Sequence, residues 1–167
     1  MFATAIACLG IVGFVHRNVT DSLPVQWDLA VPWGAVHRGD LIEFCPPTEI
    51  AREAVERAYE KEGSCPGGSL PFLKLVAAVG GDVVTIDARG VAVNDRVLPR
   101  SVPLERDPSG RPLHAQPYGV RRLPTGSLWV YGMNQSLDSR YFGPIAIGSV
   151  RRKVIGYVAS APLADLR

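Results

Sequence analysis

The sequence contains few residues of the kinds that bind metal ions. It has three cysteines and three histidines in 167 residues, and neither a CxxC nor an HExxH motif occurs. Protein zinc sites are built from closely spaced cysteines and histidines, whereas His16, His37 and His114 stand far apart. The sequence therefore predicts neither a metal site nor another cofactor.

The sequence also lacks a strong net charge. The formal net charge is only +2, and the basic residues are scattered apart from two short runs at 120–122 and 150–153. Binding to nucleic acid needs a concentrated basic face that neutralises several phosphates, so we expect no nucleic-acid partner. With 47% hydrophobic and 20% charged residues, the composition excludes a disordered chain and a polytopic membrane protein.

Only one long apolar run is present, "MFATAIACLGIVGFV" at residues 1–15, and His16 and Arg17 end it. It has no basic region before it and no clear small-residue cleavage site, so a removable signal peptide fits poorly. The run is shorter than the about 20 residues of a spanning helix, a difference that a longer natural segment or bilayer thinning can make up. We expect a membrane anchor in contact with lipid at 1–16 and one folded domain at 17–167. The alternative is a buried N-terminal strand or helix of a soluble protein.

Short stretches rich in β-branched and aromatic residues dominate the rest of the chain, with Gly, Asp, Asn and Pro between them. Together with one helical insertion they predict a mainly β, antiparallel domain. Residues 98–123 contain five prolines and little periodicity, which predicts a long surface excursion. The expected strands are 40–44, 72–80, 82–87, 90–95, 127–132 and 149–159.

The helical insertion lies between Cys45 and Cys65. Residues 48–63 read as a helix, in which Thr48 caps the start, Glu49 favours the positive end and Gly63 stops the helix. A disulfide between the two cysteines would join the chain just before this helix to the chain just after it, and we take this bond as a hypothesis. It would place the domain in an oxidising compartment; the alternative is two free cysteines in a reducing one.

Candidate catalytic groups are a serine and a lysine rather than a triad. No GxSxG motif occurs, and the histidines have no informative acidic neighbour. Lysine can activate a serine if it is neutral, and burial in an apolar setting lowers a lysine pKa. Lys74 is the lysine in an apolar run, "LPFLKLVAAVG", whereas Lys61 and Lys153 stand among charges. Taken alone, Lys74 also fits a lysine on an edge strand.

A polar segment near the C-terminus, "YGMNQSLDSRYFGPI" at 131–145, contains Asp138 and Arg140. Two residues apart, these side chains lie on the same side of an extended segment, where charge-assisted hydrogen bonds could brace a turn. The segment alone also fits an ordinary polar turn.

Three stretches together resemble one enzyme family. "NVTDSLP" at 18–24, "LKLVAAVGGDVV" at 73–84 and "SLDSRYFGP" at 136–144 resemble, in this order, the membrane-bound type I signal peptidases, serine proteases that use a Ser and Lys dyad. The serine turn, the compact length and the cysteine pair around a helix are most similar to the TraF-type peptidases of plasmid conjugation systems, which mature the conjugative pilin. The resemblance implies the fold of that family, coiled antiparallel β-sheets.

The resemblance also implies a role for each matching residue. Ser22 is the nucleophile and Lys74 the general base that takes its proton. The backbone N–H of Ser22 and the hydroxyl of Thr20 would hold the oxyanion. Ser136 would orient the lysine amine.

Asp138 and Arg140 match the structural pair that supports the site in this family. One departure is visible: "GMNQSLDSR" lacks the acidic and arginine residues that usually precede this serine in bacterial signal peptidases. The departure weakens an assignment to general preprotein processing and leaves the catalytic assignment intact.

These features lead to an expected function. The resemblance implies a membrane-anchored serine endopeptidase on the periplasmic face of a bacterial inner membrane, which cuts a pilin precursor and can pass the acyl group to the substrate's own N-terminus. One alternative is a general signal peptidase acting on signal-peptide-bearing proteins. Another is a non-enzymatic membrane-anchored β module of a secretion assembly. A self-cleaving repressor fits poorly, because an apolar segment precedes the dyad where a DNA-binding domain would stand.

Overall fold

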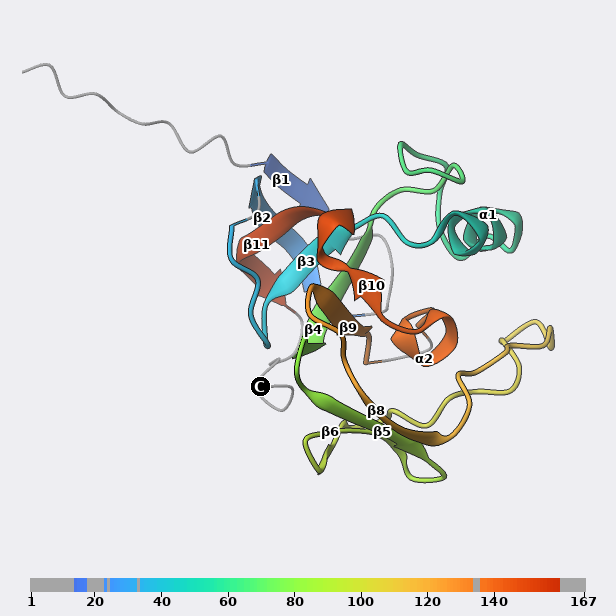
Figure 1. Ribbon diagram of the computed structural model, residues 1–167. Helices are drawn as coiled ribbons and strands as arrows, with labels where there is room; N and C mark the ends of the chain where they lie inside the picture. Colours follow the sequence, from blue (N-terminus) through green and yellow to red (C-terminus); the bar gives the residue numbers. More distant parts are fainter. Residues whose placement is uncertain (1–13, 18–22, 24, 33, 134–135, 160–167) are drawn as a thin grey trace, which may run out of the picture.

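The computed structural model describes residues 14–17, 23, 25–32, 34–133 and 136–159. They contain two antiparallel β-sheets, two short α-helices and one 3-10 helix, η1 (Ile147–Ser149) (Figure 1). The larger sheet contains, in spatial order, β1 (Phe14–Arg17), β2 (Val25–Pro32), β11 (Val150–Ala159), β3 (Leu41–Phe44), β4 (Phe72–Val79), β9 (Ser127–Tyr131) and β10 (Ile145–Ala146). The smaller sheet contains β7 (Arg96–Val97), β6 (Gly90–Val93), β5 (Val83–Asp87) and β8 (Gly119–Arg122). The predicted mainly β, antiparallel fold is confirmed.

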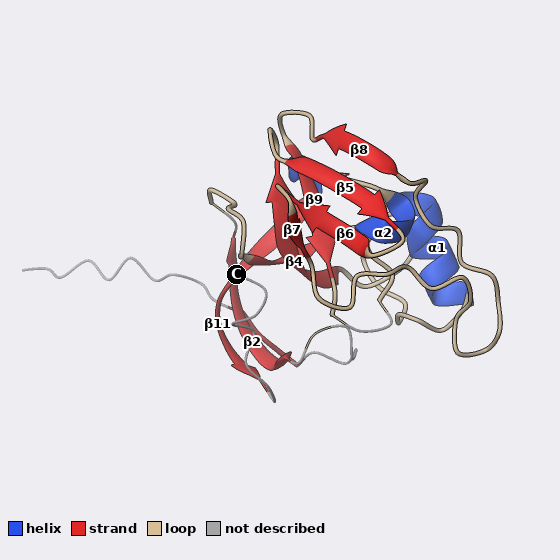
Figure 2. Cartoon of the chain, turned by 90° about the horizontal axis from the view of Figure 1, so that it is seen from below, coloured by secondary structure: helices blue, strands red, loops and turns tan. Residues whose placement is uncertain are grey.

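The strand β11 lies inside the larger sheet rather than at its edge. It pairs antiparallel with β2 on one side and with β3 on the other. Bulges interrupt its register on both sides, and β-bulges bend a strand and increase its twist. In Figure 2, β2 and β11 extend away from the part of the molecule that contains β5, β8 and the helices.

A tight connection between β4 and β5 joins the two sheets. Gly81 has φ of 95°, and its N–H donates to the Leu123 carbonyl at 2.9 Å. A Cβ at Gly80 would stand 2.8 Å from the carbonyl oxygen of Pro124, so this position allows no larger residue without a backbone shift. The connection places β5 beside the chain that enters β9 (Figure 2).

The central strand β4 contributes to two hydrophobic clusters. Side chains alternate between the two faces of a strand. Leu73 and Leu75 belong to the first cluster, which includes residues of β5 and β6, whereas Phe72 and Val76 belong to the second, which includes Phe44 and Ala54. All but the last residue of β4 are buried, and Lys74 is the charged residue among them.

The helix of the insertion, α1 (Thr48–Glu56), is shorter than predicted. Pro47 is its N-cap, without a side-chain cap hydrogen bond, so the prediction that Thr48 caps the helix was wrong. Glu49 does lie in the first turn. The helix ends at Glu56 and not at Gly63, because Ala58 adopts a positive φ of 56° and turns the chain away from the helix axis.

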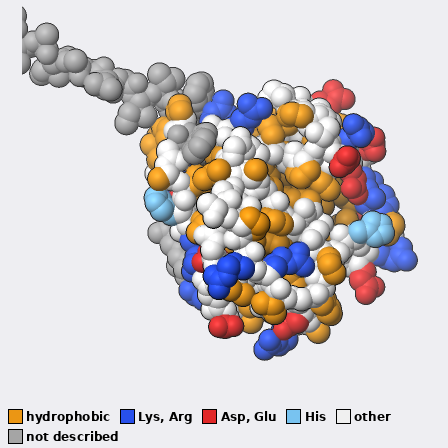
Figure 3. Space-filling model, in the orientation of Figure 1, with side chains coloured by type: hydrophobic (Ala, Val, Ile, Leu, Met, Phe, Trp, Pro, Cys, Tyr) orange, Lys and Arg blue, Asp and Glu red, His pale blue; other side chains and the backbone are white. Residues whose placement is uncertain are grey.

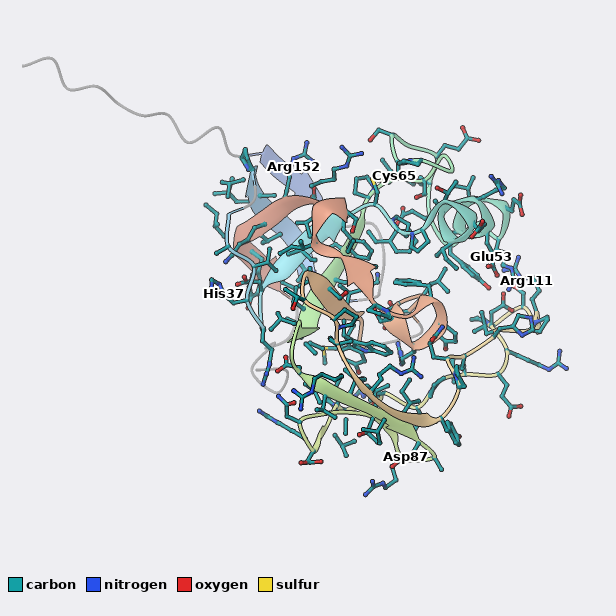
Figure 4. The ribbon with its side chains drawn as sticks, in the orientation of Figure 1. His37, Glu53, Cys65, Asp87, Arg111 and Arg152 are labelled. Carbon is teal, nitrogen blue, oxygen red and sulfur yellow. A yellow bond between two sulfur atoms is a disulfide. The ribbon has the colours of Figure 1, made fainter. Side chains whose placement is uncertain are left out.

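The predicted disulfide between Cys45 and Cys65 is present. It joins the residue after β3 to the segment that leads into β4, and so closes the insertion at its base (Figure 4). By the loop-entropy relation, a cross-link closing a loop of about 20 residues stabilises a domain by roughly 3 kcal/mol.

The strand boundaries differ from the predictions mainly where the chain turns. The predicted strand 90–95 ends at Val93, because Asn94 and Asp95 have positive φ values of 46° and 68° and form the turn into β7. The predicted excursion at 98–123 contains the short strand β8 and an isolated bridge between Arg106 and Pro112.

The predicted membrane anchor lies largely outside the described residues, since only residues 14–16 of the range 1–16 belong to a described element, β1. In the described part of the chain, no helix is both long enough and apolar enough to cross a membrane. The division into an anchor at 1–16 and a catalytic domain at 17–167 stays a prediction.

Candidate active site

Lys74 lies in the middle of β4, paired with Ile42 of β3. Its side chain is only 5% exposed. The amine nitrogen lies 5.2 Å from the centre of the Phe72 ring, which belongs to the same face of the strand two residues earlier. The lysine therefore points its amine over an aromatic ring in the interior and not into solvent, unlike a lysine that protects an edge strand.

Burial lowers the pKa of Lys74 from 10.5 to about 8, because the charged form loses its hydration. The carboxylates of Asp138 and Glu60 act in the opposite direction, and the guanidinium of Arg140 adds to the lowering. With a pKa near 8, roughly one amine in ten is neutral at pH 7. Such an amine is suited to accept a proton near neutral pH.

Asp138 and Arg140 form a buried ion pair at the start of α2 (Ser139–Phe142). The two side chains are 0% and 3% exposed. Asp138 is the N-cap of the helix and accepts a hydrogen bond from the backbone N–H of Arg140. The sequence predicted that an extended segment places the two side chains together; they meet instead because a helix begins between them.

The pair also fixes the end of β9 and the turn after it. Asp138 accepts a hydrogen bond from the Gly132 N–H at 2.8 Å, and Arg140 donates to the Gly132 carbonyl at 3.1 Å. The guanidinium carbon of Arg140 lies 5.2 Å from the centre of the Tyr131 ring. The charges of both groups also shift the pKa of Lys74, Asp138 upward and Arg140 downward.

Ser136 lies on the segment between Gly132 and α2. Its side chain is 6% exposed, and its carbonyl accepts a hydrogen bond from Arg140 at 3.3 Å. Its hydroxyl oxygen is one of two buried side-chain polar atoms without a hydrogen-bond partner in the described part, the other being Nε1 of Trp129. A buried hydroxyl is normally satisfied, so this one is available to a group that the described residues do not include or that binds during reaction.

The predicted nucleophile Ser22 and its neighbour Thr20 lie outside the described residues. Leu23, which follows Ser22 in the sequence, is 2% exposed and belongs to the first cluster with Leu73 and Leu75. These two leucines flank Lys74 in β4. The residue after the predicted nucleophile is therefore buried in the same cluster as the neighbours of the predicted base.

Glu60 is a site residue that the sequence did not indicate. It follows α1 in the insertion, and its carboxylate acts on the charge of Lys74. In the sequence Glu60 is one of several acidic residues of the insertion, and no spacing distinguishes it from Glu53, Glu56 or Glu62. Only the folded chain identifies it, through its effect on the pKa of Lys74.

The arrangement can be compared with known proteins. Residues 1–159 match the family described as "Signal peptidase, peptidase S26". The chain belongs to this family. Among curated relatives, the "Plasmid transfer protein TraF" of Escherichia coli is 36% identical to this chain over 163 residues. The alignment covers 92% of the chain and 89% of the relative.

A second relative of this family member is the "Probable conjugal transfer protein TraF" of Sinorhizobium fredii (strain NBRC 101917 / NGR234). It is 40% identical over 143 residues, covering 83% of the chain and 73% of the relative. Among solved structures, a signal peptidase I from Enterococcus faecalis V583 aligns with a TM-score of 0.38 at 18% identity, covering 75% of this chain and 98% of that one.

Proposed function

We propose that this member of the signal peptidase family is a membrane-anchored serine endopeptidase that processes a conjugative pilin precursor, with Ser22 as nucleophile and Lys74 as general base. The observation that carries the proposal is the buried amine of Lys74, which has a pKa of about 8 and whose charge is affected by the buried pair of Asp138 and Arg140. A buried lysine without catalytic use is costly, and burial is one way in which enzymes activate a lysine.

In the proposed first step, the Ser22 hydroxyl oxygen attacks the carbonyl carbon of the scissile bond while its proton passes to the neutral amine of Lys74. The Ser22 N–H and the Thr20 hydroxyl hold the oxyanion of the tetrahedral intermediate. When the intermediate collapses, the C–N bond breaks and the Lys74 ammonium returns the proton to the leaving amine. Ser136 orients the Lys74 amine, and an acyl ester on Ser22 remains.

In the second step, water or the substrate's own terminal amine attacks the ester carbon, and neutral Lys74 takes the proton of the attacking group. The ester C–O bond then breaks, and the Lys74 ammonium returns the proton to the Ser22 oxygen, which regenerates the free hydroxyl. Water gives a shortened linear product, whereas the amine gives a cyclic product that is lighter by one water. Both outcomes share the first step.

The proposed substrate rests on the relatives, which are named as plasmid or conjugal transfer proteins. The proposed location, a bacterial inner membrane with the catalytic domain facing the periplasm, is supported by the Cys45–Cys65 disulfide, because disulfides persist in oxidising compartments. In that position the nucleophile would lie a few residues beyond the lipid surface, where a membrane-bound precursor presents its cleavage site. Holding enzyme and precursor in one bilayer raises their effective concentration.

The test uses the detergent-solubilised full chain and the pilin precursor of the same conjugation system, with products analysed by intact mass. We expect wild type to remove a terminal peptide, and Ser22→Ala and Lys74→Ala to leave the precursor whole. Lys153→Ala is the matched control, since this lysine is partly exposed and pairs with Asp40.

Three other results would change the assignment. Full cleavage by Ser22→Ala would refute the mechanism. An intact pilin precursor, together with cleavage of a general secretory precursor by wild type, would favour the general signal peptidase. If neither precursor is cut and a serine-reactive acylating probe labels nothing, the protein is a non-enzymatic module of the secretion assembly.

A further inference from the structure

A cavity of about 490 Å³ lies between the start of the insertion and the segment that runs from β10 through η1 into β11. The two sides meet at Cys45, whose N–H donates to the carbonyl of Ser149 at 3.1 Å. Thr48 and Arg151 line the cavity from exposed positions, so it opens to solvent. Neither Lys74 nor the buried ion pair of the candidate active site is among the described residues that line it, so the cavity is a separate feature of the molecule.

The walls of this cavity are apolar and stiff. Four prolines line it: Pro46, Pro47, Pro66 and Pro144. Proline has a fixed φ and no N–H, so it forms a surface that changes little when a ligand binds. Pro46 and Pro66 each follow a cysteine of the Cys45–Cys65 disulfide, which ties these two prolines together. Figure 3 shows hydrophobic side chains on this face between α1 and β10. A site with such walls loses little conformational entropy on binding.

Arg151 is the one charged residue among the described residues that line the cavity. Its Nε donates to Sγ of Cys45 at 3.3 Å, and sulfur is a weak acceptor. In the described part of the chain Arg151 forms no ion pair, whereas the next residue, Arg152, pairs with Glu43 at 2.9 Å. The terminal N–H groups of the Arg151 guanidinium are therefore available to an acceptor from outside the chain.

The short strand β10 brings an open sheet edge to the same cavity. It is the last strand of the larger sheet and pairs only with β9 among the described strands. Ile145 and Ala146, its two residues, both line the cavity. An unpaired strand edge can receive an extended peptide through main-chain hydrogen bonds. The cavity thus combines a strand edge, an apolar wall and a cation.

We propose that this cavity binds an extended peptide segment of a partner protein, whose carboxylate pairs with the Arg151 guanidinium while an adjacent apolar side chain packs against the prolines. Charge decides the class of ligand: one cation and no acidic residue line the cavity among the described residues, so a carboxylate is favoured over an ammonium group. A guanidinium can hold a carboxylate by two parallel hydrogen bonds. The inference goes beyond the proposed function, since it needs neither Ser22 nor Lys74.

The start of α1 adds to the preference for a carboxylate. Pro47 and Thr48 line the cavity, and no side chain caps the helix. The first N–H groups of a helix and its dipole favour negative charge at this end. Glu49 in the first turn offsets part of this effect, although it does not line the cavity. Arg151 is therefore the main determinant of the ligand's charge.

The test uses the full-length Ser22→Ala protein in detergent, so that no peptide can be cleaved, and isothermal titration calorimetry with empty micelles as the blank. Three hexapeptides share the sequence Ser-Thr-Leu-Val-Xaa-Ala. The first has Asn at Xaa and a free C-terminal carboxylate, the second has Asp at Xaa and a C-terminal amide, and the third has Asn and the amide, so that it has no carboxylate. We expect the first or the second to bind saturably at peptide concentrations up to about 1 mM, and the third not to bind. Binding of the first alone identifies a terminal carboxylate, and binding of the second alone identifies an acidic side chain.

Two pairs of variants locate the site. Arg151→Met removes the guanidinium and keeps an apolar stem, whereas Arg52→Met removes an exposed arginine of α1 that does not line the cavity. We expect Arg151→Met to weaken binding of the carboxylate peptide by about tenfold or more, and Arg52→Met to leave it unchanged. Gly148→Leu adds a side chain at the cavity from a position where a Cβ meets nothing within 4 Å, and it should also weaken binding. Gly34→Leu, equally unobstructed but away from the cavity, is its control.

Several outcomes would overturn the inference. These are no binding of any peptide, equal binding of the peptides with and without a carboxylate, and equal binding by proteins with and without the Arg151→Met change. A dimer in light scattering that Gly148→Leu converts to a monomer would make a second copy of this chain the occupant, in place of a partner protein.

The peptidase activity is measured separately, with the pilin precursor and wild type. Peptide binding at the cavity of a protein that cleaves no precursor would keep this site and reject the proposed function. Ser22-dependent cleavage by a protein that binds none of the peptides would reject the site and keep the proposed function.

Discussion

The guanidinium of Arg140 holds the carboxylate of Asp138 with two parallel hydrogen bonds: Nε donates to Oδ1 and Nη2 donates to Oδ2, each at 2.8 Å. Such bidentate pairs are among the strong hydrogen bonds of proteins. Because both side chains are buried, each charge depends on the other for compensation. The pair also sets the start of α2, where Asp138 is the N-cap.

Removing one partner of this pair should destabilise the domain strongly. We expect Asp138→Asn to lower the free energy of unfolding by about 3–5 kcal/mol, because the Arg140 charge is left buried without its partner. Urea unfolding at pH 7 measures the loss. The matched control is Asp87→Asn, which breaks the exposed pair with Arg89 and should change stability little; equal losses in the two variants would contradict the prediction.

Lys74 should lower the stability of the fold. Its pKa is about 8 in the folded protein against an ordinary value of 10.5, so between these values the unfolded chain binds the proton more tightly and stability rises with pH. Below pH 8 the full free-energy cost of burying the charged Lys74 amine is present, on the order of 3 kcal/mol. Lys74→Met, which keeps the length and the contact with Phe72, should therefore be more stable than wild type at pH 7.

The pH dependence provides the control for this prediction. The advantage of Lys74→Met in urea unfolding should shrink as the pH rises from 8 towards 10.5. Over this range the lysine of the unfolded chain also loses its proton, so burying the uncharged amine no longer costs wild type any proton-binding free energy. An advantage that is constant over this range would show that packing, and not charge, distinguishes the two proteins.

Ser136 allows stability and activity to be separated. Its buried hydroxyl has no hydrogen-bond partner in the described part of the chain, so Ser136→Ala should leave the melting temperature unchanged or slightly higher. If the hydroxyl orients the Lys74 amine, cleavage of the precursor should fall by roughly 10- to 100-fold, as expected when a catalytic group is misplaced. A clear loss of stability with unchanged cleavage would assign Ser136 a structural role.

The disulfide can be tested by counting reactive thiols and by measuring the free energy of unfolding without it. Of the three cysteines, two are bonded, so unreduced, denatured protein should expose one reactive thiol, that of Cys8. Replacing Cys45 and Cys65 together by alanine should lower the free energy of unfolding by about 3 kcal/mol. Three reactive thiols without reductant would contradict the pairing.

The strands could be predicted because their signal is local. Alternating and β-branched residues identify β3, β4, β5 and β9 within a residue or two of their observed ends, since side-chain periodicity depends on neighbours in the sequence. The ends that were missed are turns, where Asn94, Asp95 and Ala58 adopt positive φ values. Alanine gives no sequence signal for that conformation, so the early end of α1 could not be predicted.

The site was only partly predictable, because it depends on contacts between distant segments. Asp138 and Arg140 stand two residues apart, and their pairing could be inferred from the sequence. Glu60 and Lys74 are separated by the loop that contains Cys65, and nothing local connects their charges. The burial that lowers the Lys74 pKa is likewise a property of the assembled sheet and its clusters.

The place of β11 between β2 and β3 has a consequence for the order in which the molecule can form. A ribosome delivers β1 and β2 first and β11 last among the described elements, with several seconds of synthesis between them. Until then the nascent hairpin of β1 and β2 exposes a strand edge with no partner, and unpaired edges invite wrong associations. Proteolytic trimming into Val150–Ala159 would likewise divide the larger sheet into two pieces, whereas loss of an edge strand would only narrow it.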